Sequence, residues 1–281
     1  MGILNVTPDS FSDGGRFRLR DQALKHALLM IEAGADIIDI GGESTRPGAE
    51  PVSRQCEIDR VLPVIEAIRA ASDAPISIDT RHAEVMRLAV AAGAGLINDV
   101  NALRGPQALQ TASDLGVPVC LMHMQGEPRT MQSAPTYHDV VVEVGEFLRE
   151  RLAACEAAGI PQSRVLVDPG FGFGKLMHHN LSLLAGLPRL SRIGPPLLVG
   201  LSRKGLIGQV LGRPVEQRLA GSLALALAAV ERGASWVRVH DVEQTHDALT
   251  VLARIWAHQR TDGVACVGSC NPRVGGDSAL G

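Results

Sequence analysis

The sequence predicts a closed (β/α)₈ barrel that forms one large domain. The chain has 281 residues, of which 46% are hydrophobic, enough for one large core. Short β-rich runs that end in polar residues or glycine alternate with longer segments of helical spacing, as in parallel strands joined by crossovers. Eight such units fit in about 260 residues, the usual size of this barrel. The alternative, an open doubly wound sheet, is disfavoured because an early GxGxxG turn is absent.

The expected strands are runs of aliphatic and β-branched residues that stop at turn-forming or polar residues. In chain order they are residues 2–5 (GILN), 36–42 (DIIDIGG), 75–80 (PISIDT), 95–100 (GLINDV), 118–123 (PVCLMH), 164–170 (RVLVDPG), 196–202 (PLLVGLS) and 236–241 (WVRVHD). The first begins almost at Met1. Either the start has been trimmed, or other residues seal the bottom of the barrel.

Helices are expected between these strands, where apolar residues recur at intervals of three and four. They include residues 20–35, 57–72, 83–94 and 140–159. The most apolar segment, residues 219–230 (LAGSLALALAAV), is too short to cross a bilayer and is expected to be a buried helix. The barrel is assigned to residues 1–262, and the Gly- and Ser-rich tail 263–281 is expected to be mobile.

Composition excludes several classes of partner. The formal net charge is -3, with no basic block or acidic tail, so neither a nucleic acid nor an anionic membrane is expected to bind. A small-molecule substrate is expected instead. The N-terminus lacks the pattern of a secretion signal, and the five cysteines form no CxxC pair, so reduced thiols and a cytoplasmic location are expected. A metal site at Cys266 and Cys270 is disfavoured because no histidine or second cysteine pair is near.

Polar side chains stand at nearly every strand end. In a (β/α)₈ barrel the reacting groups lie at the C-terminal ends of the strands and in the loops that follow. Any one of these residues could belong to the solvated rim, but the complete set indicates a functional site. The set is Asn5, Glu43, Ser44, Thr45, Arg46, Asp79, Asn98, Asp99, His123, Asp168, Ser202, Arg203, Lys204, Arg238 and His240.

Three of these residues suggest what the site binds. Asp79, Asn98 and Asp168 each follow an apolar run, so they should project into a partly desolvated pocket. A buried carboxylate needs a partner. That partner is either Lys204, in a structural ion pair, or a flat ligand whose adjacent N–H groups match a carboxylate, as an aminopyrimidinone does. Asn98 can donate and accept at once, which suits a heterocycle with both an N–H group and a ring nitrogen.

Three of the five phenylalanines, Phe11, Phe171 and Phe173, lie in loops after strands. They are expected to offer stacking surfaces, the alternative being local loop anchors. Two loops, residues 6–17 and 42–53, are long and rich in Gly, Pro, Ser and Thr. They are expected to act as lids that exclude water once a ligand is bound, the alternative being solvated connections.

The last predicted strand suggests a polyanion site. Strand alternation places Trp236, Arg238 and His240 on one side of the run WVRVHD. Arg238 and His240, with Asn5 across the closing seam, resemble a clamp with room for a divalent cation. Mg²⁺ needs few protein ligands when phosphates supply the rest, so Asn5 alone would be enough. Without Arg238 beside it, His240 would be interpreted as a structural histidine.

Taken together, these motifs resemble the dihydropteroate synthases of bacterial folate synthesis. GILNVTPDSFSDGG and DIIDIGGESTRPGA are similar to the two signatures of that family. SIDT, LINDV, LMHMQGEPRTMQ, LVDPGFGFGK, GLSRKGLIG and VRVHD resemble its other strand ends in the expected order. The resemblance runs from residue 2 to about 250. It implies a pterin-binding barrel enzyme that condenses dihydropterin pyrophosphate with p-aminobenzoate, with Mg²⁺ as cofactor, and we expect a homodimer.

The resemblance also implies roles for individual residues. The pterin pocket falls on Asp79, Asn98, Met122, Asp168, Phe173 and Lys204. The diphosphate site falls on Asn5 with Mg²⁺, Arg238 and His240, aided by Asp79 and by the loop residues Thr45 and Arg46. The p-aminobenzoate site falls on Phe11, Thr45, Pro47, Phe173, Ser202 and Lys204, with Arg46 in the same lid loop. Catalysis is expected to depend on Asp79, Lys204, Arg238 and His240.

Two departures and two alternatives accompany this resemblance. The segment that precedes the first strand in the family is missing, and Gly205 stands where the family has serine, which would loosen a helix start and weaken carboxylate binding slightly. A methyltetrahydrofolate methyltransferase would share the pterin pocket, but Arg238, His240 and the STRPG loop argue against it. A non-catalytic pterin-binding paralogue should have damaged lid loops, and these are intact in the sequence.

Overall fold

The computed structural model describes residues 1–7, 16–44 and 48–261. Within them lie eight short strands, one inside each predicted run. Four predicted site residues, Phe11, Thr45, Arg46 and Pro47, lie outside the described residues, as do most of the first lid loop and the tail 263–281. The strands are β1 (Gly2–Asn5), β2 (Ile38–Gly41), β3 (Ile76–Asp79), β4 (Leu96–Asp99), β5 (Val119–Met122), β6 (Val165–Asp168), β7 (Leu198–Val199) and β8 (Trp236–Val237).

The strands form a closed parallel barrel, as predicted. Strands β1 to β6 make a continuous sheet in sequence order, and β7 pairs with β8. Single parallel bridges join the two sheets at both seams, between Val167 and Leu197 and between Gly2 and Val239. At the second seam the Ile3 amide donates to the Val239 carbonyl at 2.9 Å. Every strand therefore has a neighbour on each side, and all C-terminal ends face one mouth.

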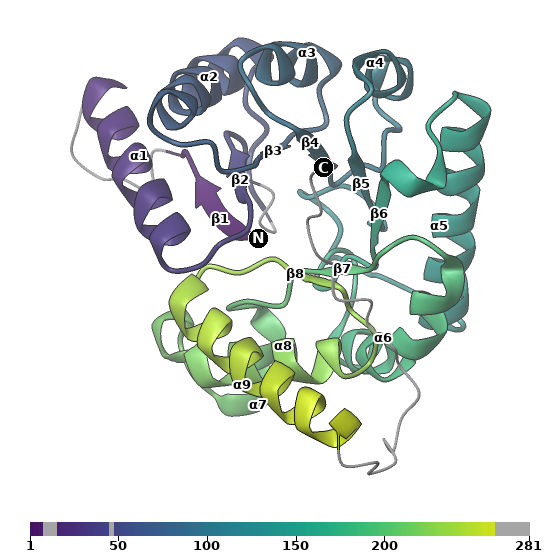
Figure 1. Cartoon of the computed structure of the whole chain (residues 1–281). Coiled ribbons are helices and arrows are strands. Elements are labelled where there is room, and N and C mark those ends of the chain that lie inside the picture. Colours follow the sequence, from purple (N-terminus) through teal and green to yellow (C-terminus); the bar gives the residue numbers. More distant parts are fainter. Residues whose placement is uncertain (8–15, 45–47, 262–281) are drawn as a thin grey trace.

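Helices surround the barrel in an outer ring (Figure 1). They are α1 (Arg16–Glu32), α2 (Arg54–Ala71), α3 (Ala83–Ala91), α4 (Ala108–Leu115), α5 (Val140–Ala157), α6 (Met177–Leu190), α7 (Gly205–Leu211), α8 (Leu219–Val230) and α9 (Val242–Thr261). Side-chain caps begin two of them. Ser53 Oγ accepts from the Cys56 amide at the start of α2, and Asp139 accepts from two amides at the start of α5. None of the described helices is both long and apolar enough to cross a membrane.

Two apolar layers stabilise this arrangement. The larger one lies between the strands and the helices and includes Leu4, Ile40, Ile65 and Ile97. The smaller one lies inside the barrel at its N-terminal end and consists of Met1, Ile37, Leu96, Cys120, Leu166, Leu198 and, partly buried, Trp236. Because one side chain comes from each of seven strand regions, these side chains close the bottom of the barrel.

Helix α8 differs from its prediction. It spans the predicted residues 219–230, but only Ser222, Ala226 and Ala229 are buried, and Leu219 is 37% exposed. The prediction of a buried helix was therefore wrong. The physical reason is that α8 packs sideways against α7 and α9 in the outer ring (Figure 1), so only one narrow face touches the barrel.

Candidate active site

The mouth of the barrel brings the predicted pterin residues together. Asp79, Met122 and Asp168 are the last residues of β3, β5 and β6, and Asn98 is the third residue of β4. Strand register places Asp79 beside Asn98, and Met122 beside Asp168. These side chains therefore line neighbouring strand ends, within reach of one small ligand.

Arg238, which directly follows β8, bonds to acids of β2 and β3 across this mouth. Its Nε donates to Oδ2 of Asp39 at 2.6 Å, and its Nη2 donates to Oδ2 of Asp79 at 2.8 Å. The Asn98 amide donates to the same Asp39 oxygen at 3.1 Å. Asp39 is fully buried in β2, and the sequence-based reasoning missed it. A signal was present, because an acid between Ile38 and Ile40 must point inward if the isoleucines face the helices.

Charge sharing in this network sets its protonation. Burial raises the pKa of Asp79 to about 7, Arg238 opposes this, and Asp39 reinforces it. Burial acts to lower the pKa of Arg238, but Asp39 and Asp79 outweigh it and raise the pKa above its ordinary value. The guanidinium therefore stays charged and is shared between two carboxylates, so Asp79 accepts a proton near neutral pH more readily than an exposed aspartate.

Asp168, Lys204 and Phe173 form the opposite wall. Asp168 Oδ1 accepts from the Gly170 amide at 2.7 Å, and burial raises the pKa of Asp168 to about 6. Lys204 Nζ lies 4.1 Å from the centroid of the Phe173 ring, a cation–π contact. Burial lowers the pKa of Lys204 to about 8. Phe173 also packs against Met122, Met124 and Met131, an apolar surface suited to a flat ring.

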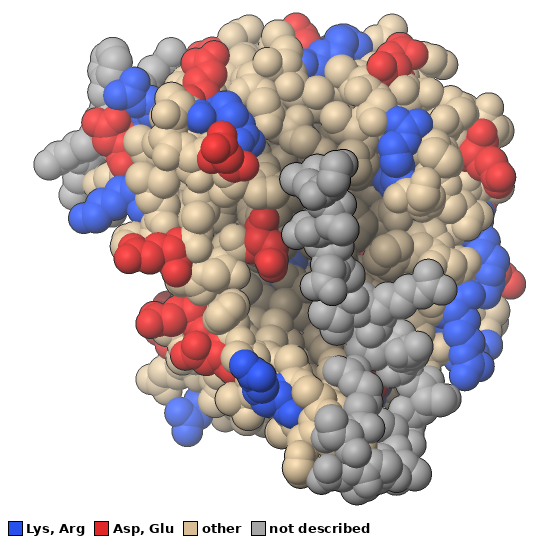
Figure 2. Space-filling model, viewed as in Figure 1, with Lys and Arg blue, Asp and Glu red and all other residues tan. Residues whose placement is uncertain are grey.

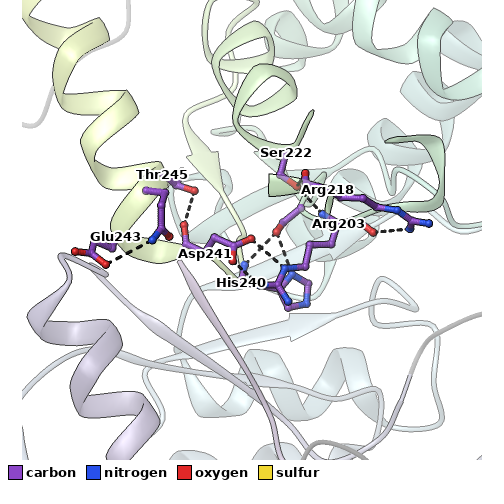
Figure 3. Close-up of polar contacts among 9 residues, drawn as sticks. Arg203, Arg218, Ser222, His240, Asp241, Glu243 and Thr245 are labelled. Atoms are coloured by element: carbon purple, nitrogen blue, oxygen red, sulfur yellow. Dashed lines mark hydrogen bonds and ion pairs between the residues drawn. The ribbon is translucent and has the colours of Figure 1, made fainter. Parts of the chain in front are cut away.

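His240 and Ser202 interact directly. The Ser202 hydroxyl lies 3.0 Å from Nδ1 of His240 and accepts from the His240 amide at 3.2 Å. Ser202 is 7% exposed. Nearby, Arg203 forms an ion pair with Asp241 and lies beside His240 (Figure 3). These contacts hold the connections after β7 and β8 together. The predicted contact of Ser202 with a benzoate carboxylate remains a prediction.

Asn5 ends β1 and is half-buried beside Gly41 of β2. Its amide oxygen is a hard donor of the kind that Mg²⁺ accepts. No group of three or more His, Cys, Asp or Glu side chains suited to a metal occurs among the described residues. A cation held by Asn5 would take its other oxygen ligands from a substrate or from water.

Three other residues have structural roles. His123 lies 2.9 Å from Lys175 Nζ, and burial lowers its pKa to about 2. Asp99 accepts from the amides of Asn101 and Leu103 and so shapes the turn after β4. Phe171 is 2% exposed within the main core. The stacking prediction for Phe171 was therefore wrong, because the ring anchors its loop, which was the alternative interpretation.

The base of the second loop is held by one carboxylate. Glu43 Oε1 accepts from the Val52 amide at 3.2 Å, so it joins the two ends of this loop. Glu43 also pairs with Arg81 of the loop after β3 at 3.2 Å. The described ends of the second loop are therefore anchored beside Asp79.

A family model described as pterin binding enzyme matches residues 1–240, which include this barrel and the acids, amide and guanidinium at its mouth. Dihydropteroate synthase from Escherichia coli K12 is 55% identical over 252 residues, covering 90% of this chain and 89% of that protein. The chain belongs to the dihydropteroate synthase family, whose members are transferases.

Solved structures agree with this assignment. Dihydropteroate synthase from Xanthomonas albilineans with 4-aminobenzoic acid has a TM-score of 0.87 and 57% identity, covering 91% of this chain and 92% of that one. The same enzyme with 7,8-dihydropteroate has a TM-score of 0.84 and 54% identity, covering 91% and 92%. These matches favour the dihydropteroate synthase family over the two alternatives, a methyltetrahydrofolate methyltransferase and a non-catalytic pterin-binding paralogue.

Proposed function

We propose that this chain condenses (7,8-dihydropterin-6-yl)methyl diphosphate with p-aminobenzoate, giving 7,8-dihydropteroate and diphosphate. The observation that carries the proposal is the network at the barrel mouth, in which Arg238 lies between Asp39 and Asp79 while Asp168 and Lys204 face it. The relatives carry the name of this activity, and one of them binds 7,8-dihydropteroate.

The pterin would lie among Asp79, Asn98 and Asp168. A carboxylate can accept from two adjacent N–H groups of a ligand. In Asp168, Oδ1 accepts from the Gly170 amide, so Oδ2 is the oxygen proposed to accept from the pterin. Phe173 and Met122 supply an apolar wall. This pocket recognises an N–H edge and a flat ring at once.

The diphosphate would bind near Arg238, His240 and Asn5. The Asn5 oxygen fits a hard cation with one protein ligand, the other ligands coming from the diphosphate. When bound there, Mg²⁺ neutralises charge on the leaving group. Arg238 and His240 add hydrogen-bond donors for the same oxygens. Thr45 and Arg46 are assigned to this site by the resemblance alone.

Charge separation then explains the reaction. Breaking the C–O bond leaves negative charge on diphosphate, where Arg238 and His240 donate, and positive charge over the pterin, where Asp79 and Asp168 lie. The aniline nitrogen of p-aminobenzoate attacks the exposed methylene to form the C–N bond and gives up one N–H proton to solvent or to the released diphosphate. No strong nucleophile is required, so orientation and exclusion of water supply much of the rate.

The p-aminobenzoate would lie against Phe173 and Lys204. The 4.1 Å contact between the Lys204 ammonium and the Phe173 ring places a cation and an aromatic surface together. These suit a carboxylate-bearing ring. Ser202 is proposed to hold the benzoate carboxylate, and Phe11, Thr45 and Pro47 to close over it.

A coupled assay tests the proposal. Diphosphate release should require both substrates and Mg²⁺ together, and the product should have the mass of 7,8-dihydropteroate. Release of diphosphate from the pterin substrate alone, or without metal, would contradict the assignment.

The enzyme is further proposed to be a homodimer that associates through α7, α8 and α9. These helices lie side by side (Figure 1). They and the turn after α7 expose Val210, Leu211, Val215, Leu219, Val251 and Ile255, at 37% to 61% exposure. Neighbouring exposed apolar residues of this kind mark interaction surfaces. Val210→Asp with Val251→Asp should shift the mass measured by light scattering from two chains to one; an unchanged mass would contradict this interface.

A cytoplasmic location is proposed from thiol chemistry. Cys56, Cys120 and Cys155 are free cysteines, as is usual in reducing compartments.

Acidic and basic side chains are interspersed over the face in Figure 2, which agrees with small substrates rather than polyanionic partners.

A further inference from the structure

The stretch PGFGFGK, residues 169–175, ends in a lysine that the proposed reaction does not use. Lys175 is 3% exposed. Its Nζ donates to the carbonyl oxygens of Gly170 at 2.9 Å and Phe173 at 3.0 Å, and it lies 2.9 Å from Nδ1 of His123. An ammonium group has three donors. Each donor of Lys175 therefore has one acceptor.

The third acceptor stays neutral. Burial, together with the charge of Lys175, lowers the pKa of His123 to about 2. Since Nδ1 then accepts from the ammonium, the ring proton belongs on Nε2. Burial also lowers the pKa of Lys175 to about 7, and the charge of Asp168 opposes that shift. Lys175 is thus mainly protonated at pH 6.

Two glycines allow the stretch to wrap closely around this ammonium. Gly170 has a φ of 69°, and a Cβ there would lie 1.8 Å from the His123 carbonyl oxygen. Gly174 has a φ of 61°, and a Cβ there would lie 2.4 Å from the Gln125 carbonyl oxygen. Only glycine fits such contacts. The stretch is therefore pressed against the loop after β5, with Lys175 between them.

The carbonyl groups that Lys175 binds belong to residues that shape the pterin pocket. The Gly170 amide donates to Asp168, and the Phe173 ring makes a cation–π contact with the Lys204 ammonium. A buried charge that served only stability would gain little over an apolar side chain. Its bond to the Phe173 carbonyl and the effect of its charge on Asp168 place it where it can act on the site.

We infer that Lys175 is a positioning residue for the pterin, which fixes the loop that carries Phe173 and supplies a positive charge behind Asp168. The inference rests on the proposed function and deepens it. Lys175 does not touch the substrate. It acts through the backbone of residues 169–174 and through the charge state of one acid.

The charges that face Asp168 come from three elements. Lys175 is on its own loop, Lys204 follows β7 and Arg238 follows β8, and all three lower the pKa of Asp168 against the larger effect of burial. Cys120 of β5 also faces it, as a neutral thiol whose pKa burial raises. Losing Lys175 should therefore raise the pKa of Asp168 above about 6.

The experiment measures the affinity for 6-hydroxymethyl-7,8-dihydropterin by calorimetry from pH 5 to 8. The variants are Lys175→Met and Lys175→Gln, the latter keeping two N–H donors without the charge. Tyr137→Phe is the matched control, because the Tyr137 hydroxyl donates to the Gly174 carbonyl at 2.9 Å and its loss removes a bond to the same loop but no charge.

We expect Lys175→Met to weaken binding at least tenfold at pH 6, where the Lys175 ammonium is still mainly charged. In both Lys175 variants the pH at which affinity is half lost on acidification should rise by about 0.5 units or more. Tyr137→Phe should leave that pH unchanged. If Lys175→Met does not fold, the shift in Lys175→Gln decides the question.

Wild-type affinity in both Lys175 variants would overturn the inference, and so would weaker binding without a shift along the pH axis. If the unmodified protein bound no dihydropterin, the proposed function would fail together with the inference. If it bound dihydropterin and released diphosphate normally, a negative result in the variants would concern Lys175 alone.

Discussion

The Arg238 guanidinium lies 2.6 Å from Asp39, a carboxylate buried in the second strand. The same Asp39 oxygen accepts from the Asn98 amide, so one atom orients a residue assigned to the pterin and a residue assigned to the diphosphate. As a carboxylate Asp39 can only accept, which fixes the Asn98 nitrogen toward it and leaves the Asn98 carbonyl oxygen for a ligand.

Asp39→Asn should lower kcat/KM for the pterin substrate by about 10- to 100-fold, the usual effect of removing a partner that orients a functional group. Asparagine has the same shape as aspartate, but its side-chain NH₂ group can donate to Asn98. The Asn98 amide would then be free to rotate by 180° and present its NH₂ group to the ligand. Steady-state kinetics measures the loss. Ser77→Ala, at the paired position of the third strand, is the control. Equal kinetics in both variants would show that the contact does not orient the site.

Arg238→Ala should lower turnover at least tenfold while the fold persists, because donors to the departing diphosphate are lost. Asp79 would then lose the positive charge that lowers its pKa and would bind a proton more readily. Circular dichroism checks the fold, and diphosphate release checks the rate. A normal steady-state rate would remove Arg238 from the diphosphate site.

Stability should fall as pH rises, because a buried acid holds its proton more tightly in the folded state. Burial raises the pKa of Glu57 to about 7, against a smaller opposing effect of the Thr80 hydroxyl. The folded protein therefore binds more protons than the unfolded chain between an ordinary glutamate pKa and pH 7, and the free energy of unfolding decreases across that range, by roughly 3 kcal/mol for this group.

Glu57→Gln should flatten this dependence, so that the variant loses less stability between pH 5 and 8 than the wild type does. Urea unfolding at each pH gives the two slopes. Since Asp79, Asp99 and Asp168 also have raised pKa values, a residual slope should remain. Identical slopes in both proteins would mean that Glu57 is not the group responsible.

Sequence reasoning predicted the barrel and most of its mouth because two patterns are local. Each strand is a short apolar run, and barrel geometry then brings all the strand ends to one rim. Asp39 was missed because it lies two residues before the end of β2, inside an apolar run that has the pattern of a core strand. Lys175 was missed because its acceptors are backbone carbonyls, which leave no trace in side-chain composition.

Burial of whole segments was predicted less well, since it depends on neighbours far along the chain. Phe171 and α8 show this in opposite directions. The loop phenylalanine is in the core, whereas most residues of the most apolar helix are only partly buried or exposed. The local sequence does not show which face of a segment packs against the barrel. This holds both for a phenylalanine among glycines and for a run of alanine and leucine.

Sulfonamides, as analogues of p-aminobenzoate, should compete with it. They should raise the apparent KM for p-aminobenzoate and leave kcat unchanged, because Phe173, Lys204 and Ser202 are assigned to a single benzoate pocket. Initial rates at several concentrations of both compounds provide the test. A noncompetitive pattern would mean that the pocket is misassigned.

Gly205→Ser should stabilise the protein slightly and tighten p-aminobenzoate binding. Gly205 is the first residue of α7, and a Cβ there meets no atom within 4 Å, so serine fits without displacing a neighbour. Replacing glycine in an unstrained position reduces the freedom of the unfolded chain, a gain of about 0.4–1 kcal/mol. Thermal unfolding should show a higher Tm, and the KM for p-aminobenzoate should fall modestly. Gly205→Ala separates the two effects: it should give the same rise in Tm without the change in KM, and if both variants lower KM equally, the serine hydroxyl has no part in holding the carboxylate.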